Sequence, residues 1–433
     1  MTIRPLLPTL LAAAALAADP APVRPNIVYI FTDQQTAAAM GHLAPGRLAT
    51  PGMDRLAREG VRFDAAYCTY PLCTPSRASM FSGRMPHAVG VMGNGLGLPA
   101  SGRQQEMGWV FRNAGYATAY AGKWHLPKQT MPEGHGFEVI APMGDEQATV
   151  ASIDYLKRSH DRPFLLVTSL FQPHSCCVLH RHEDPRDDPQ LPWPADARTP
   201  DFIARCPPLP ANFGPSSATP EVVGALQRKA KDPSTIPPHV RKVWGEKQNY
   251  NAARSWTPDQ HRAYLWGYDR WVEKADSCVN RILDAIDQAG LAGNTLVVFS
   301  SDHGDMVSAH AMTAKVYQYE ESVRIPFIMR LPGRIQAGIS TAHLVSNGLD
   351  LLPTLCDYAG IAPPSDLPGR SLRPLAEGAS PAEWRRDLVI QSGGDLGDAR
   401  LLRTTTHAYM RYGDELGGVV AEELYDQRSD PGQ

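Results

Sequence analysis

The run Asn26-Ile-Val-Tyr-Ile-Phe31 is apolar along almost its whole length and is followed at once by Thr32-Asp33-Gln34. A strand with one face in solvent alternates apolar and polar residues. A continuous apolar run is instead typical of a strand buried on both faces of a parallel sheet. We therefore expect residues 26–31 to form a buried parallel strand that ends in polar side chains.

Three further apolar runs have the same character, and helical patterns lie between them. The runs are residues 117–121, 164–170 and 295–299, and the helical patterns are residues 104–113 and about 260–288. In the longer helical pattern, apolar residues recur at three- and four-residue spacing. Strands that alternate with helices in this way predict an α/β fold.

Each of the four predicted strands is followed by side chains of the kinds that carry out catalysis. These are Asp33 and Gln34, Lys123 and His125, His174, and Asp302 and His303. In open parallel sheets, ligands bind beyond the carboxyl ends of the strands. Any one of these residues could equally be a helix cap or a turn residue, but the four strand ends together predict one functional site.

Four of these side chains are candidate metal ligands. Asp33 and Asp302 offer carboxylates, Gln34 an amide oxygen and His303 an imidazole. An oxygen-rich set favours a hard divalent cation such as Ca²⁺, and the single nitrogen also admits Mn²⁺ or Mg²⁺.

Cys73-Thr-Pro-Ser-Arg77 opens another predicted helix. We expect Thr74 to cap a helix that starts with Pro75. Residue 73 would then lie just before the helix N-terminus, where backbone N–H groups favour an anion, and Arg77 can fold back toward it. A thiol at that place would have a lowered pKa, so a thiol nucleophile or a redox cysteine is one interpretation of Cys73.

The bulk properties narrow the class of protein. The 433 residues carry a formal net charge of −3, which argues against nucleic acid or an anionic membrane as the main partner.

The N-terminus predicts a signal peptide over residues 1–18, and hence export to the periplasm or the cell exterior. The evidence is Arg4, the apolar residues 6–16 and the small residues around Ala17. No later segment is apolar enough to span a membrane. Without Cys73, six of the seven cysteines remain, an even number that an oxidising compartment could pair.

Two regions differ from the alternating pattern. Residues 181–244 are rich in proline and have little periodicity, which suggests either a wall over the site or a solvated loop. Beyond a helix predicted at residues 350–360, the chain divides into a catalytic domain over 24–376 and a small C-terminal subdomain over 377–433. Short strands are expected in that subdomain at residues 387–391, 401–411 and 422–425.

The motifs together resemble those of a type I sulfatase of the alkaline phosphatase superfamily, from about Pro25 onward. The matching segments are Pro-Asn-Ile-Val-Tyr-Ile-Phe-Thr-Asp33-Gln34, Cys73-Thr-Pro-Ser-Arg-Ala-Ser-Met-Phe-Ser-Gly-Arg84, Gly-Lys123-Trp-His125-Leu, Pro173-His174, Ser-Asp302-His303-Gly-Asp and Ala-Lys315-Val-Tyr-Gln-Tyr-Glu-Glu. The resemblance implies a large domain with a mixed, mostly parallel sheet between helices, and a small C-terminal domain with a short antiparallel sheet.

The resemblance also implies a mechanism. A maturation enzyme would oxidise Cys73 to formylglycine, whose hydrate would attack sulfur and ligate the metal together with Asp33, Gln34, Asp302 and His303. The remaining roles fall to Arg77 and Lys123, which would hold the hydrate and the sulfate, to His125, which would expel sulfate, and to His174 and Lys315, which would assist the leaving oxygen. The implied substrate is a sulfated carbohydrate or a related sulfate ester.

Two alternatives stay open at this point. Gln34 and His303 stand where many sulfatases have Asp and Asn, and this pairing occurs in branches that hydrolyse phosphonate monoesters and phosphodiesters. A non-catalytic binder of sulfated glycans is the other alternative, which the full set of ionisable residues disfavours.

Overall fold

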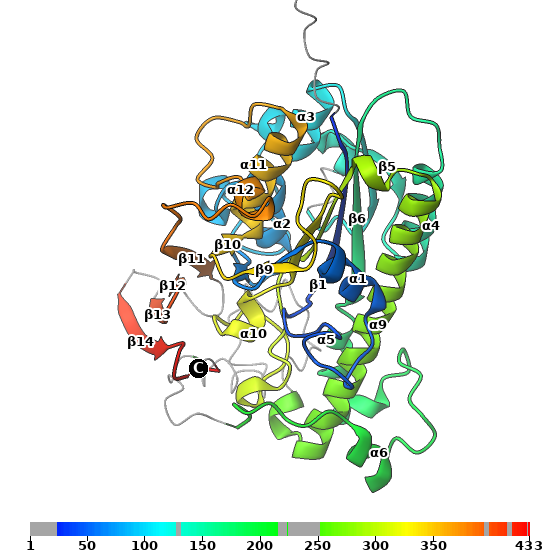
Figure 1. Ribbon diagram of the computed structural model, residues 1–433. Helices are drawn as coiled ribbons and strands as arrows, with labels where there is room; N and C mark the ends of the chain where they lie inside the picture. The colour runs from blue at the N-terminus through cyan, green and yellow to red at the C-terminus, as the bar shows by residue number, and fades with distance from the viewer. Residues whose placement is uncertain are drawn as a thin grey trace, which may run out of the picture.

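β1 (Asn26–Asp33) lies inside an eight-stranded sheet, between β6 (Phe164–Pro173) and β7 (Thr295–Ser301) and parallel to both (Figure 1). The strand order is β5-β4-β6-β1-β7-β8-β2-β9, and β8 is antiparallel to both of its neighbours. The other five strands are β2 (Val61–Phe63), β4 (Ala117–Gly122), β5 (Glu138–Ala141), β8 (Phe327–Arg330) and β9 (Ile339–Thr341). The predicted α/β fold with a mixed, mostly parallel sheet is confirmed.

The computed structural model describes residues 24–126, 131–214, 223, 252–393, 398–413, 418–430 and 432–433. The predicted signal peptide, and the proline-rich region beyond residue 214 except Val223, lie outside the described residues. No helix among the described residues is long and apolar enough to cross a membrane.

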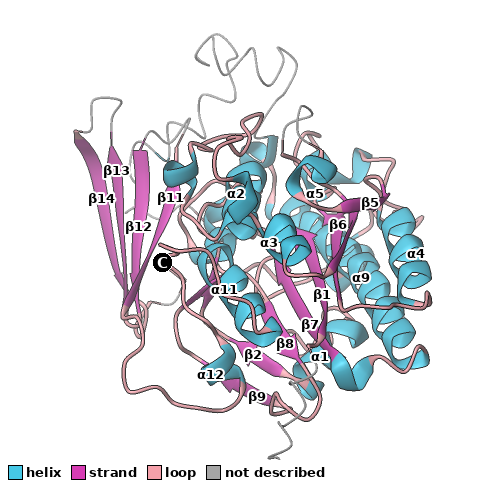
Figure 2. Ribbon diagram, turned by 90° about the horizontal axis from the view of Figure 1, so that it is seen from above, coloured by secondary structure: helices cyan, strands magenta, loops and turns pink. Residues whose placement is uncertain are grey.

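Helices cover both faces of the large sheet (Figure 2). Val28 and Ile30 of β1 pack with the helices of one face, whereas Tyr29 and Phe31 pack with those of the other. The first face carries α1 (Pro51–Glu59), α4 (Asp145–Leu156) and α9 (Pro258–Gln288), and the second carries α2 (Cys73–Ser82), α3 (Met107–Asn113) and α11 (Asn347–Ala359). Burial of β1 on both sides is the arrangement that its continuous apolar sequence predicts.

The shorter elements complete the chain. The short α-helices are α5 (Cys176–Leu179), α6 (Pro200–Arg205), α10 (Glu320–Val323) and α12 (Arg373–Ala376), and β3 (Ala66–Tyr67) pairs with β10 (Val345–Ser346). Single 3₁₀ turns occur at Pro86–Val89, Arg103–Gln105, Pro132–His135, Pro185–Asp187, Ala252–Ser255, Ala292–Asn294 and Ala309–Ala311. Part of the proline-rich region therefore forms short helical turns.

Two helix starts differ from the prediction. The helix expected at 104–113 begins at Met107, after a 3₁₀ turn. The helix expected from residue 350 begins at Asn347, because the carboxylate of Asp350 accepts the N–H of Ser346 at 2.8 Å and ends the preceding strand there. Pro353 therefore lies inside the helix.

The C-terminal sheet contains β11 (Asp387–Ser392), β12 (Asp398–Thr404), β13 (His407–Gly413) and β14 (Val419–Asp426), paired antiparallel in that order. The predicted antiparallel sheet is confirmed, but the single strand expected at 401–411 is wrong. The hydroxyl of Thr404 accepts the N–H groups of Thr406 and His407, so the chain turns and forms two strands.

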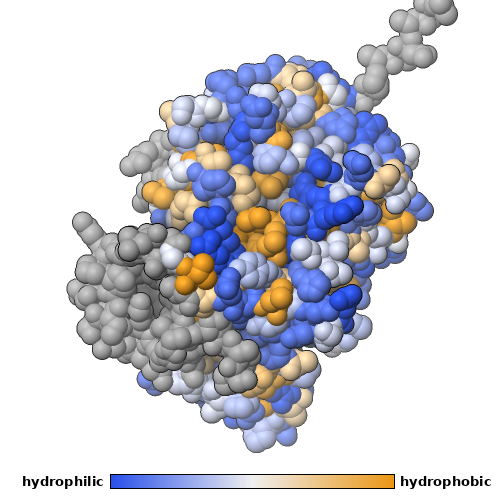
Figure 3. All heavy atoms as spheres, turned by 90° about the vertical axis from the view of Figure 1, so that its left-hand side faces the viewer, coloured by the Kyte–Doolittle hydropathy of each residue, from blue (hydrophilic) through white to orange (hydrophobic). Residues whose placement is uncertain are grey.

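One face of this sheet packs on the large domain. Leu388, Ile390, Leu401 and Met410 join the core that contains Tyr29 and Phe31. The other face carries the exposed side chains of Leu402 and Leu424. Figure 3 shows the face of the molecule that lies on the left in Figure 1, where hydrophobic side chains are scattered among hydrophilic ones. The apolar and polar alternation along these strands is thus explained by one buried face.

Two adjacent glutamates at the start of α10 are predicted to affect stability in opposite directions. Burial raises the pKa of Glu321 to about 7, and its Oε2 has no hydrogen-bond partner among the described residues. An acid whose pKa is raised on folding loses stability as the pH rises from its unfolded value, near 4.3, through its folded value. Glu321→Gln is therefore expected to be more stable than the wild type by about 3 kcal/mol at pH 8, with the difference vanishing near pH 4.

Glu320→Gln is the matched control. Glu320 accepts a 2.8 Å hydrogen bond from the buried guanidinium of Arg403, so its loss leaves a buried cation unpaired and should destabilise the protein by about 3 kcal/mol or more. Urea unfolding of both variants from pH 4 to pH 8 measures the effects. Equal destabilisation by the two substitutions would contradict the assigned protonation of Glu321.

Candidate active site

Four strand ends meet beyond the carboxyl edge of the large sheet, as predicted. Asp33 ends β1, and Lys123, His174 and Asp302 directly follow β4, β6 and β7. These strands are parallel neighbours, so their carboxyl ends lie at one edge. The N-terminus of α2 brings Cys73 to the same place.

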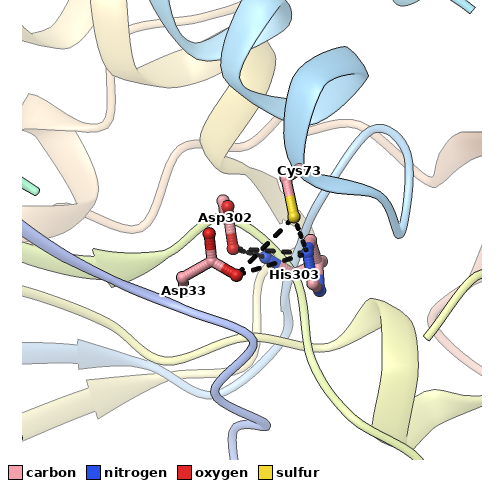
Figure 4. A group of neighbouring side chains, drawn as sticks. All are labelled: Asp33, Cys73, Asp302 and His303. Atoms are coloured by element: carbon pink, nitrogen blue, oxygen red, sulfur yellow. Dashed lines mark hydrogen bonds and ion pairs between the residues drawn. The ribbon is translucent and has the colours of Figure 1, made fainter. Parts of the chain in front are cut away.

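The centre of the site is a buried cluster of Asp33, Cys73, Asp302 and His303 (Figure 4). Their potential ligand atoms all lie within 4.8 Å of one another. Cys73 Sγ is 3.2 Å from His303 Nε2 and 3.6 Å from Asp33 Oδ1, and His303 Nε2 is 3.6 Å from Asp302 Oδ1. Sγ is thus the atom of residue 73 that faces the cluster.

Arg77 holds the two carboxylates of the cluster in place. Its guanidinium, fully buried, donates to Oδ2 of Asp33 and to Oδ2 of Asp302, both at 2.8 Å. A further N–H donates to Ser169 Oγ at 3.0 Å. The Oδ1 atoms of both carboxylates consequently face the cluster. Arg77 thus bonds the carboxylates rather than residue 73, and its predicted contact with the nucleophile stays a prediction.

The donor set fits a hard divalent cation. His303 Nδ1 lies 2.9 Å from the carbonyl of Gly304, which can only accept, so the proton sits on Nδ1 and Nε2 can offer its lone pair to the cluster. Burial and the neighbouring Asp33 raise the pKa of Asp302, a sign of two carboxylates crowded together. A divalent cation held by Asp33 and Asp302 would relieve that repulsion.

The surroundings of Cys73 differ from the expected helix cap. α2 begins at Cys73 itself, and the hydroxyl of Thr74 donates to the carbonyl of His125 at 2.7 Å instead of capping the helix. The predicted cap is therefore wrong. The hydroxyl does not cap the helix because it is already bonded to the loop after β4. The backbone N–H of Thr74 donates to Asn94 Oδ1 at 3.1 Å.

The lowered thiol pKa predicted for Cys73 is borne out by its neighbours. Burial raises the pKa, but Lys315, Lys123 and His303, with a hydrogen bond from the His125 side chain, hold it well below its usual range. Lys315 Nζ lies 3.1 Å from Cys73 Sγ. The positive charges around residue 73 therefore stabilise a negative charge on it.

The other predicted residues line the same pocket. Lys123 Nζ donates to Asp33 Oδ2 at 2.6 Å, and His174 Nε2 lies 3.8 Å from Asp33 Oδ1. His125 is exposed, and His174 is partly exposed, so both can meet a molecule arriving from solvent. Lys315 is about one-tenth exposed and lies 4.0 Å from Asp33 Oδ1.

Gln34 takes a position that sequence reasoning did not anticipate. Its amide nitrogen donates to Asp305 Oδ2 at 2.7 Å, and its amide oxygen accepts from the thiol of Cys177 at 3.0 Å. Its backbone N–H donates to Asp302 Oδ1 at 3.1 Å. The side chain thus borders the cluster, and its role as a metal ligand stays a prediction.

Sequence reasoning gave no role to Asp305 or to the Cys176–Cys177 pair, although each begins two residues after a predicted site residue. Burial raises the pKa of Asp305 to about 6, and its Oδ1 accepts from Tyr264 of α9. The sequence signal that could have identified them was their position shortly after His303 and His174. All seven cysteines lie in the described part of the chain and are free and buried, so the structure pairs none of the six that an oxidising compartment could join.

Comparisons with known proteins agree with this geometry. The family model described as Sulfatase matches residues 25–361, and the model described as N-sulphoglucosamine sulphohydrolase, C-terminal, matches residues 308–433. Together these two matches run from the first strand of the large sheet to the end of the C-terminal sheet.

Individual relatives are similar over most of the chain. A Delta 4,5-hexuronate-2-O-sulfatase of Bacteroides thetaiotaomicron is 28% identical over 96% of this chain and 85% of its own length. An ulvan-active sulfatase of Formosa agariphila is 30% identical over 90% of this chain and 73% of its own length. A solved 2-O GAG sulfatase superposes with a TM-score of 0.76 and 28% identity, covering 94% of this chain and 86% of that one. A phosphonate monoester hydrolase of Agrobacterium radiobacter shares the fold, with a TM-score of 0.71 at 21% identity over 94% of this chain and 90% of its own.

Proposed function

The chain belongs to the sulfatase family, and from that premise we propose that it releases sulfate from a sulfated carbohydrate through a nucleophile made from Cys73. The observation that carries the proposal is the position of residue 73. It is buried among Lys315, Lys123 and His303, beside two carboxylates that Arg77 orients. A nucleophilic oxygen there meets the positive charge that a sulfate group requires.

The proposed nucleophile needs a maturation step. Conversion of the Cys73 CH₂–SH group to an aldehyde removes two electrons from Cβ, replaces sulfur by oxygen and releases sulfide. We propose that a maturation enzyme supplies the oxidant. Addition of water to the aldehyde gives a hydrate with two hydroxyl groups, one of which attacks while the other later gives up its proton.

The described residues account for the proton transfers. Lys123 and Lys315 hold the sulfate oxygens while residue 73 attacks sulfur and the S–O bond to the sugar breaks. His174, near Asp33, and Lys315, near Cys73 Sγ, would then protonate the departing oxygen. His125 then takes the proton of the remaining hydroxyl of residue 73, which expels sulfate and restores the aldehyde.

We propose Asp33, Asp302, His303 and residue 73 as the ligands of one divalent cation, with Gln34 at its edge. The donor set favours Ca²⁺, with Mn²⁺ or Mg²⁺ as alternatives. The cation would neutralise charge that develops on the sulfate oxygens. Arg77 contributes by holding the carboxylates in the orientation in which their Oδ2 atoms bond its guanidinium and their Oδ1 atoms face the cluster.

The carbohydrate assignment has support from the relatives, whose names specify hexuronate, N-acetylglucosamine and ulvan as substrates. Export of the protein to the periplasm or the cell exterior, proposed from residues 1–18, suits a polymeric substrate. Sequencing the N-terminus of the mature protein tests the export proposal, and a retained Met1 would contradict it.

A substrate panel tests the function. We expect sulfate release from at least one sulfated saccharide, with a kcat/KM at least 10²-fold above that for a phosphodiester or a phosphonate monoester, because binding energy from the sugar adds to that from the sulfate. The panel is 4-nitrophenyl sulfate, bis(4-nitrophenyl) phosphate, phenyl phosphonate monoester and sulfated mono- and oligosaccharides, with released sulfate measured directly. Faster turnover of the phosphorus esters would replace the sulfate assignment by the alternative hydrolase.

A further inference from the structure

Lys315 lies in a strained segment of backbone. The residues on either side of it, Ala314 and Val316, have φ values of 68° and 81°, which non-glycine residues rarely adopt and a β-branched valine least of all. Two backbone hydrogen bonds hold the strained residues, from Met306 N–H to the carbonyl of Ala314 at 2.7 Å and from Val316 N–H to the carbonyl of Pro71 at 3.0 Å. Such a conformation persists only when further contacts fix the segment.

The C-terminal sheet supplies one such contact through Glu423 of β14. Its carboxylate is buried and accepts hydrogen bonds from three tyrosine hydroxyls, those of Tyr319 at 3.1 Å, Tyr412 at 2.6 Å and Tyr425 at 2.6 Å. Tyr412 and Tyr425 belong to the C-terminal sheet, whereas Tyr319 lies four residues after Lys315. The opposite side of Tyr319 stacks on His310, with ring centroids 4.5 Å apart.

A second contact with the C-terminal sheet is made by the residue after Tyr319, which is Glu320. Arg403 of β12 donates to Glu320 at 2.8 Å, and the hydroxyl of Tyr67 donates to both oxygens of the same carboxylate at 3.1 Å. Both charged side chains are largely buried, so solvent screens the pair weakly. Two successive residues at the end of the Lys315 segment are therefore anchored to two strands of the C-terminal sheet.

We propose that Glu423 is a positioning residue that holds the Lys315 ammonium against residue 73 through its hydrogen bond to Tyr319. The C-terminal sheet thereby acts in the chemical step without touching the substrate. This inference rests on the proposed function, because it takes Lys315 as a group that assists the leaving oxygen. It assigns Tyr319 to the same path and excludes Tyr425, which shares the carboxylate but is itself a residue of β14 in the C-terminal sheet.

The leaving oxygen provides a readout that loss of stability alone would not change. A cation that stabilises a departing oxygen matters more when that oxygen is more basic. Displacement of Lys315 should therefore slow phenyl sulfate, whose leaving oxygen is basic, more than 4-nitrophenyl sulfate. A general loss of folded enzyme would slow both esters by the same factor.

The experiment compares Tyr319→Phe with Tyr425→Phe in the full-length, matured enzyme. Each substitution removes one hydroxyl from the same carboxylate oxygen, Oε1 of Glu423. We expect Tyr319→Phe to lower kcat/KM for phenyl sulfate about tenfold and that for 4-nitrophenyl sulfate by about twofold. Tyr425→Phe should leave both unchanged. Glu423→Gln should follow Tyr319→Phe, because one amide oxygen cannot accept from three hydroxyls.

A double-mutant cycle and hydrogen exchange complete the test. Adding Tyr319→Phe to Lys315→Met should cause no further loss if the hydroxyl acts through Lys315. Amide exchange of residues 313–321 should be faster in Tyr319→Phe than in Tyr425→Phe, whatever the activity. Equal amide exchange in Tyr319→Phe and Tyr425→Phe, or an equal loss of kcat/KM on the two esters in Tyr319→Phe, would overturn the proposal.

Failure of the proposed function would look different. A wild-type enzyme inactive on every sulfate ester would contradict the proposed function, and the exchange comparison would still decide whether the Tyr319 hydroxyl holds residues 313–321 in place.

Discussion

Replacement of Cys73 by alanine is expected to reduce sulfate release by at least about 10⁴-fold. The reason is that the variant keeps the cationic pocket but loses the atom that bonds to sulfur. Cys73 is fully buried at the start of α2, and alanine fits the helix, so the fold should persist. The measurement is steady-state sulfate release from the best substrate of the panel.

Cys68→Ala is the matched control for this variant. Cys68 is also buried and lies close in sequence, but burial raises the pKa of its thiol and it lies outside the charged cluster. This control should lose some stability and keep its turnover per folded molecule. Undiminished turnover in Cys73→Ala, or an equal loss in both variants, would contradict the assignment of residue 73 as the nucleophile.

The second large effect is a loss of stability, which we expect in the variant Arg77→Met. Arg77 bonds one oxygen of Asp33 and one of Asp302, all three side chains being fully buried. Its loss leaves two buried carboxylates without this partner, and we expect a destabilisation of about 3–5 kcal/mol in urea unfolding at pH 7 without added divalent cation. Arg77→Lys should recover part of this, because an ammonium supplies the charge but not the planar fork.

The destabilisation should depend on pH in a defined direction. Burial and Cys73 raise the pKa of Asp33, but Lys123, His174 and Arg77 outweigh them and hold it below its ordinary value. A carboxylate with a depressed pKa contributes stability above its unfolded pKa, near 3.9, and loses that contribution as the pH falls through the folded value. The difference between wild type and Arg77→Met should therefore stay nearly constant down to about pH 4 and shrink as the pH falls below that value. A difference independent of pH would indicate that Arg77 acts by packing alone.

The sequence predicted the parts of the site that depend on strand ends. Asp33, Lys123, His174 and Asp302 each follow a buried apolar run, and parallel pairing brings such ends together whatever the details of the helices. The same reasoning predicted the α/β class. The C-terminal antiparallel sheet came from the family resemblance and from short apolar runs.

What the sequence could not predict depends on contacts between distant residues. From the sequence, the hydroxyl of Thr74 was expected to cap the helix. In the structure it donates to the carbonyl of His125 instead, because the loop after β4 brings that carbonyl next to it. Arg77 looked like a residue aimed at the nucleophile, but two carboxylates from different strands compete for its guanidinium more strongly.

Gln34 and Glu423 illustrate the same limit. The orientation of the Gln34 amide is decided by Asp305 and Cys177, which lie far from it in sequence. Glu423 lies in an ordinary amphipathic strand, and nothing local distinguishes it from a surface glutamate. Its three tyrosine partners come from two strands and a loop that only the tertiary structure brings together.

The mass of the peptide that contains residue 73, taken from protein made in its native source, tests the central claim most directly. The account predicts a side chain lighter than cysteine by the exchange of CH₂–SH for an aldehyde, and capture of the peptide by a hydrazide reagent. An intact cysteine at position 73, in protein that hydrolyses sulfate esters at full rate, would contradict it.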